Sequence, residues 1–157
     1  GMSEHLALVA VMSTGIGNSI GRIIAPAVSD KLGRTITIVL CCIITAASCL
    51  LMISATGALY VAAVFLIAFA YGGTSGINPV ISTELFGAKY SGTNYGLVMI
   101  SIAASSVVFG RISAAVGGSA GGDFTGVFLL CAALCAVPVV LMLLMRRFCL
   151  THGGKKI

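Results

Sequence analysis

Long apolar runs separated by short polar segments dominate the chain. A transmembrane helix needs about 20 predominantly apolar residues, and five runs reach that length: residues 6–28, 35–55, 59–81, 95–116 and 124–145. The runs are too long and continuous for barrel strands, which alternate in polarity over about ten residues. The pattern predicts an all-α polytopic membrane protein. Residues 1–157 would form a single transmembrane domain with five spans and a tail over residues 146–157.

The composition agrees with this class, because 59% of the residues are hydrophobic and only 8% are charged. Soluble globular proteins carry about 25% charged residues, so the chain cannot be a soluble domain. The net charge of +5 does not indicate nucleic-acid binding, since the chain has no Trp and few other aromatic side chains for base stacking. Five of the six cysteines lie inside apolar runs without a C-x-x-C pair. We expect a protein of the lipid bilayer that is not an enzyme and has no cofactor, metal or nucleic-acid partner.

The basic residues predict the orientation of the spans, because Lys and Arg concentrate in cytoplasmic segments. Seven of the nine lie in segments that five spans would place on one side: Lys31, Arg34, Lys89, Arg146, Arg147, Lys155 and Lys156. The opposite side contains no Lys or Arg. We therefore expect an outside N-terminus and a cytoplasmic C-terminus. The plasma membrane or an inner membrane is the default location, with an organelle membrane as the alternative.

The start of the chain bears on its completeness. An outside N-terminus normally has a cause such as a signal peptide, yet the five residues before the first span contain no basic segment and no cleavage pattern. Gly1 before Met2 also resembles the scar of tag removal. We therefore expect that an upstream part of the protein is missing.

A charged segment between the first two spans carries a family resemblance. Residues 30–34 read D-K-L-G-R, in which Asp30 would close one helix, Gly33 would permit a tight reversal and Arg34 would open the next helix and pair with Asp30. The segment resembles the loop signature of the major facilitator superfamily, G-x-x-x-D-[RK]-x-G-R, although Pro26 replaces a Gly and Thr35 a common basic residue. The resemblance implies a gating loop that braces neighbouring helices in one conformational state. Its members are Asp30, Lys31, Gly33 and Arg34.

A second segment refines the resemblance. Residues 84–87 read E-L-F-G and residues 92–96 read G-T-N-Y-G. They resemble the loop between helices ten and eleven of the oxalate/formate antiporter group and, more loosely, of the monocarboxylate transporters. Three further spans follow the helix after the D-K-L-G-R loop, so the five spans would be helices eight to twelve, the C-terminal half without its N-terminal half. Gly72 and Gly76 would provide a close helix contact or a bend before Pro79.

Arg22 lies inside the first span, where an ionisable residue is costly and rare. It could extend towards the membrane surface or brace the loop. Alternatively, it could face the central cavity and hold an anionic substrate, together with Asn18 one helical turn earlier. The resemblance favours substrate binding, because these transporters bind a substrate carboxylate with an arginine of the eighth helix. Further candidates for lining or gating are Tyr71, Asn78 and Asn94.

Arg111, in the fourth span, also has two interpretations. It could extend towards the outer surface, or it could be a second anion contact. The oxalate-type proteins carry a lysine in the middle of the eleventh helix, and an approximate alignment places Ile102 at that position. A dicarboxylate would then lose one of its two charge partners, which favours a monocarboxylate or another single anion.

These features predict part of a secondary active transporter that moves a small organic anion, a mono- or dicarboxylate. The substrate would bind between two halves that rock to alternate access. No acidic residue lies in the middle of a span, so this chain shows no proton relay of its own. The alternative is a truncated or remnant membrane protein without independent transport, which assembles with another chain.

Overall fold

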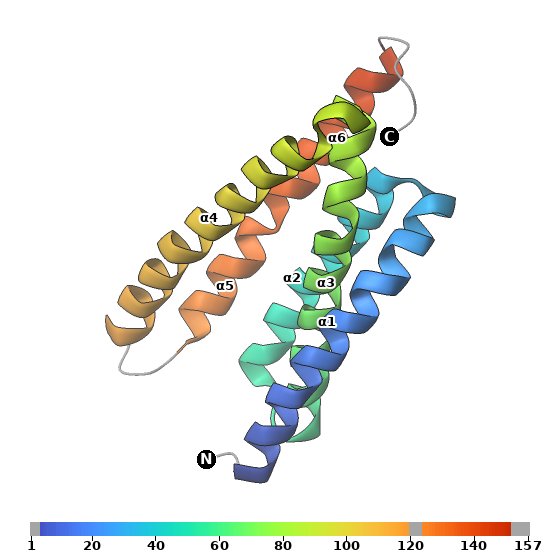
Figure 1. Cartoon of the computed structure of the whole chain (residues 1–157). Coiled ribbons are helices and arrows are strands. Elements are labelled where there is room, and N and C mark those ends of the chain that lie inside the picture. The colour runs from blue at the N-terminus through green and yellow to red at the C-terminus, as the bar shows by residue number, and fades with distance from the viewer. Residues whose placement is uncertain (1–3, 120–123, 152–157) are drawn as a thin grey trace.

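The computed structural model describes residues 4–119 and 124–151, and this part of the chain is entirely helical (Figure 1). The predicted tail beyond Thr151, with Lys155 and Lys156, lies outside these residues. The elements are α1 (Glu4–Leu32), α2 (Arg34–Ser54), α3 (Ala58–Phe86), the 3-10 turn η1 (Ala88–Tyr90), α4 (Ser91–Ser119), α5 (Thr125–Leu134) and α6 (Ala136–Thr151). Five helical stretches are long and apolar enough to cross a membrane. The predicted all-α membrane class is confirmed.

Several helices extend beyond the apolar runs. α1 continues to Leu32, so Asp30 and Lys31 belong to its last turn. Only Gly33 separates α1 from α2, and its φ of 95° lies in the left-handed region that glycine adopts without strain. The helices are longer than the apolar runs because an apolar run ends at its first polar residue. Backbone hydrogen bonding continues past that residue until another residue interrupts the helix. Gly33 ends this helix, as the sequence predicted for the reversal.

The last span consists of two helical segments, whereas the sequence predicted one over residues 124–145. A turn at Cys135 separates α5 from α6. Pro138 explains the interruption, because proline lacks the N–H that would bond to Leu134 and its ring opposes that carbonyl group. The stretch Thr125–Leu144 still has the length and composition of one membrane crossing.

The helices form two groups (Figure 1). α1, α2 and α3 pack against one another, while α4 lies beside α5 and diverges from α1. α2 contacts α5 and α6, whereas α4 contacts α3, η1 and α5 but not α1. A small core of Ala25, Ile38 and Ile77 joins the first three helices, and Met142 of α6 packs against it. From residue 91 to 116, no residue of α4 is buried.

The closest contact in the fold is the parallel crossing of α1 and α3. A Cβ atom added to Gly17 would lie 2.8 Å from the carbonyl oxygen of Phe65, and one added to Gly21 would overlap the carbonyl oxygen of Phe69. Real side chains do not approach the backbone so closely, so only glycine allows this spacing on α1. Small residues of this kind let helices meet at short range inside a membrane.

Glycines of α3 meet α1 in the same way. A Cβ atom added to Gly72 would overlap the carbonyl oxygen of Asn18, and one added to Gly76 would lie 3.0 Å from the carbonyl oxygen of Arg22. The predicted close helix contact at these two glycines is confirmed, while α3 continues as a helix through Pro79. The crossing therefore fixes the positions of Asn18 and Arg22 on α1 relative to α3.

We predict that Gly72→Ala lowers the free energy of unfolding by about 1–3 kcal/mol, because the methyl group forces two helix backbones apart. The measurement is a titration of the purified chain with dodecyl sulfate in mixed micelles, followed by circular dichroism. Gly96→Ala is the matched control, since a Cβ atom there meets nothing within 4 Å. Equal stability of the two variants would contradict the close crossing.

Candidate functional site

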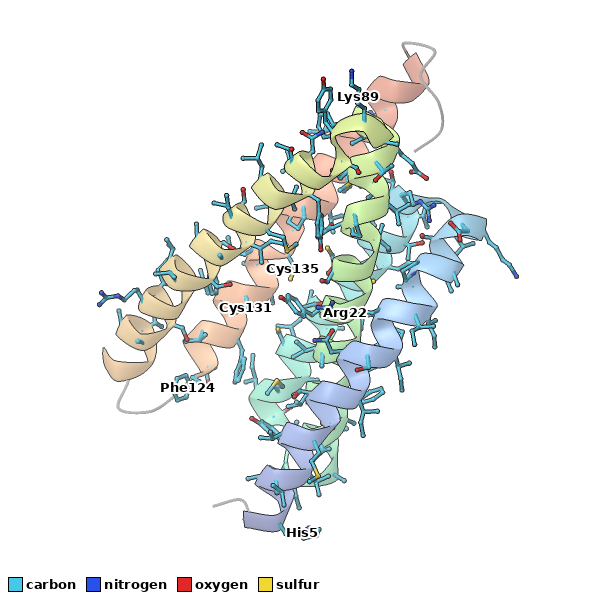
Figure 2. All side chains as sticks on the ribbon, viewed as in Figure 1. His5, Arg22, Lys89, Phe124, Cys131 and Cys135 are labelled. Carbon is cyan, nitrogen blue, oxygen red and sulfur yellow. The ribbon has the colours of Figure 1, made fainter. Side chains whose placement is uncertain are left out.

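Asn18 and Arg22 form a polar pair on α1. Residues four apart lie on the same face of a helix, and the Nε atom of Arg22 donates a hydrogen bond of 3.1 Å to the Oδ1 atom of Asn18. Figure 2 shows Arg22 near the middle of the length of the bundle. The expectation that Asn18 shares the face of Arg22 is confirmed, and the hydrogen bond holds the guanidinium group in one orientation.

A cavity of about 540 Å³ opens beside this pair, between α1, α2, α3 and α5. Asn18 of α1 and Tyr71 of α3 both line it, and most of the other lining residues are apolar. Its volume is within the range of small-molecule sites, about 300–1,000 Å³. The structure thus brings together three of the residues selected from the sequence: Asn18 and Tyr71 at the cavity wall, and Arg22 bonded to Asn18.

Three other candidates lie elsewhere. Asn78 is seven residues beyond Tyr71 on α3, and it is not among the residues that line the cavity. Asn94 and Arg111 belong to α4, which does not contact α1, the helix of Arg22. The structure therefore does not bring these three residues to the cavity wall beside Arg22.

The Asp30–Arg34 segment forms an ion cluster at the end of the first three helices. The Nη1 atom of Arg34 lies 2.6 Å from the Oδ1 atom of Asp30, which confirms the predicted pairing. The Nη2 atom of Arg34 lies 3.0 Å from the Oε1 atom of Glu84, near the end of α3. Arg34 also donates to the Ser29 hydroxyl group of α1. One guanidinium group therefore links α1, α2 and α3.

Glu84 is the partner that the sequence analysis missed. It lies 50 positions after Arg34, so no local spacing indicates the contact. A usable signal was present, because Glu84 opens the E-L-F-G segment and five alternating spans place it on the same side as Arg34. The remaining residue of the predicted loop, Lys31, is exposed.

The distribution of the acidic groups leaves Arg22 in a different position from Arg34. The two carboxylates whose side chains the structure describes, Asp30 and Glu84, both pair with Arg34. Neither of these two carboxylates pairs with Arg22, whose side chain is bonded to a neutral amide. A cation inside a membrane span is costly unless it has a partner or faces water. Among the described residues, the hydrogen-bond partner of the Arg22 side chain is therefore a neutral amide and not a carboxylate.

No cluster of metal-binding side chains occurs within residues 4–119 and 124–151. Cys49 of α2 and Cys131 of α5 both line the cavity. They are free cysteines, and at this position they act as small apolar residues in the wall.

Comparison with known proteins identifies the family of this helical bundle. The model of the Major Facilitator Superfamily matches residues 1–149. The chain belongs to the major facilitator superfamily. This is a family of membrane transporters and not of enzymes, in agreement with the prediction from sequence. No curated protein and no solved structure matches the chain.

The three charged side chains of the ion cluster differ in their exposure to solvent. In this major facilitator protein, the side chain of Arg34 is 14% exposed, against 63% for Asp30 and 45% for Glu84. The arginine is enclosed while the carboxylates remain accessible to water. A partly exposed pair of this kind contributes modestly to stability.

For this cluster we predict a coupling free energy of about 0.2–1 kcal/mol between Arg34 and Glu84, the range for exposed ion pairs. The measurement is a double-mutant cycle of unfolding with Arg34→Gln and Glu84→Gln. The control cycle combines Lys31→Gln with Glu84→Gln and should give a coupling near zero. If the coupling free energy of Arg34 with Glu84 is no larger than that of Lys31 with Glu84, the Arg34–Glu84 pair does not link α2 and α3.

Proposed function

We propose that this chain forms helices eight to twelve of a transporter that moves a small organic anion, a mono- or dicarboxylate, by alternating access. In this proposal Arg22 binds the carboxylate of the substrate. The observation that carries the proposal is that both described carboxylates pair with Arg34, while Arg22 stands beside a cavity with a neutral partner. Family membership supplies the transport activity.

The geometry of Arg22 suits a carboxylate. Arginine stays protonated, and its planar fork can donate two parallel hydrogen bonds to the two oxygens of a carboxylate. Its Nε atom is occupied by Asn18, and within the described part of the chain no hydrogen bond engages its Nη1 and Nη2 atoms. These two nitrogens are the donors that would bind the substrate. Asn18 would act as a positioning residue that holds the guanidinium group of Arg22 in a fixed orientation.

The number of cations in reach favours a monocarboxylate within this class. A compact dicarboxylate needs two cationic partners, and Arg111 is on a helix that does not contact α1. Movement of the helices during transport could bring Arg111 closer, so it stays a candidate for a second anion contact.

The ends of the helices support the proposed orientation. The Arg34–Glu84 pair places the junction of α1 and α2 beside the end of α3, and the N-terminus lies at the opposite end of α1 (Figure 1). Lys31, Arg34 and Lys89 therefore share one end of the bundle, and we infer that this end faces the cytoplasm. The bilayer would be the plasma membrane or an inner membrane. The exposed α4 would be covered in part by the N-terminal half of the transporter.

The test is uptake of a radiolabelled carboxylate into vesicles that contain the complete transporter with this segment. Arg22→Gln should lower uptake roughly 10–100-fold, because a hydrogen-bonded charge partner is lost. Arg22→Lys should keep part of the activity, since it retains the charge but loses the fork. The amount of transporter in the vesicles is measured by immunoblot.

Lys89→Gln is the control for the loss of one positive charge. Lys89 is exposed and lies 5.4 Å from the centre of the Tyr90 ring, in η1 and outside the cavity. Uptake should stay at the level of the unmodified protein. If Arg22→Gln retains the same uptake as Lys89→Gln, Arg22 is not in the substrate site. If vesicles without the N-terminal half show saturable uptake, the proposal that this chain is only part of the transporter is wrong.

A further inference from the structure

We propose that the cavity beside Arg22 receives the apolar body of the substrate. The substrate would then be a carboxylate that carries an alkyl chain or a ring of several carbons, and not a compact dicarboxylate. This inference rests on the proposed function, because it assigns the carboxylate to Arg22. It adds a specificity site in the wall of α1, α2, α3 and α5.

The polarity of the site changes along α1. Arg22 lies at one end, Asn18 one turn earlier, and Thr14 and Gly15 one turn before Asn18, where the cavity continues. α3 runs parallel to α1 and shows the same order, with Tyr71 beside the polar end and apolar residues before it. A ligand with its charge at Arg22 would therefore extend its other end towards Gly15, away from the cation.

The wall at that end suits hydrocarbon. Val64 and Ala68 of α3 and Phe128 of α5 line the cavity there, together with other apolar side chains. Burial of a second carboxylate among such groups is strongly unfavourable without a partner. Sites for small molecules commonly combine an apolar wall with a few polar groups that fix the orientation of the ligand. Asn18, Tyr71 and Arg22 would be those groups.

The volume of the cavity leads to the same conclusion. It measures about 540 Å³. An engineered apolar cavity of about 150 Å³ already holds benzene. A cavity of this volume has room for the alkyl or aryl group of a larger carboxylate, a group that oxalate, with six heavy atoms, does not have.

The experiment measures binding to the complete transporter with this segment in lipid nanodiscs, with radiolabelled hexanoate as the probe and protein-free nanodiscs as the background. Unlabelled acetate, butyrate, octanoate and oxalate compete with the probe. Affinity should rise by about fourfold for each added methylene group, the value for burial of a CH₂ group in an apolar site. Oxalate should compete no better than acetate. An affinity that does not depend on chain length, or tighter binding of oxalate, would overturn the inference.

The variant Gly15→Leu tests the location. A Cβ atom at Gly15 meets nothing within 4 Å, so the leucine can enter the cavity without a clash. Octanoate affinity should fall roughly 16-fold, because the side chain displaces about two methylene groups at about fourfold each, while acetate affinity stays the same. Gly96→Leu, at an open position on α4 outside the cavity, should change neither. Equal octanoate affinities in Gly15→Leu and Gly96→Leu would overturn the proposed location.

Arg22→Gln separates this inference from the proposed function. In one outcome, Arg22→Gln lowers the affinity for both acetate and octanoate, but affinity in the unmodified protein does not depend on chain length. Only the assignment of the cavity then fails. If neither carboxylate loses affinity in Arg22→Gln, the role of Arg22 fails, and the cavity inference that depends on it fails as well. Loss of affinity for both, with a chain-length dependence that Gly15→Leu removes, is the expected result.

Discussion

The contact between the backbones of α1 and α3 is the constraint on which the site depends. Gly21 and Gly72 have no side chain, so carbonyl oxygens of the facing helix occupy the space where a Cβ atom would be. Two helices that touch along several turns cannot slide or rotate freely. Asn18 and Arg22 are therefore held beside α3, with the cavity on the same side of the crossing. A larger residue at either glycine would shift Asn18 and Arg22, the residues of the proposed anion site, without removing either side chain.

The few charges of the chain have distinct tasks. Arg34 is bound to Asp30 and Glu84 where α1, α2 and α3 meet at one end, and water near the membrane surface limits the strength of these pairs. Arg22 lies within a span, where insertion of an arginine costs about 2.5–3.5 kcal/mol on translocon scales. In the proposed function, a transported anion is the charged partner of this arginine. Both the ion cluster and the proposed anion site include residues of α1.

The sequence predicted the features that depend on local order. The apolar runs predicted the membrane class. Gly33 and the spacing of Asp30 and Arg34 predicted the tight reversal and its ion pair. Gly72 predicted a close contact between helices. The sequence did not predict contacts between distant segments of the chain. The Arg34–Glu84 pair joins residues 50 positions apart, and the cavity wall combines four helices. Neither follows from hydropathy, which records the polarity of a residue but not its neighbours.

A structure of the complete transporter with a bound alkyl carboxylate, determined by electron cryomicroscopy, would measure the decisive distances. The account predicts carboxylate oxygens about 2.7–2.9 Å from the Nη1 and Nη2 atoms of Arg22, with the alkyl chain directed along α1 towards Gly15. A carboxylate bound elsewhere, with Arg22 paired to an acidic residue of the other half or to a lipid phosphate, would contradict it.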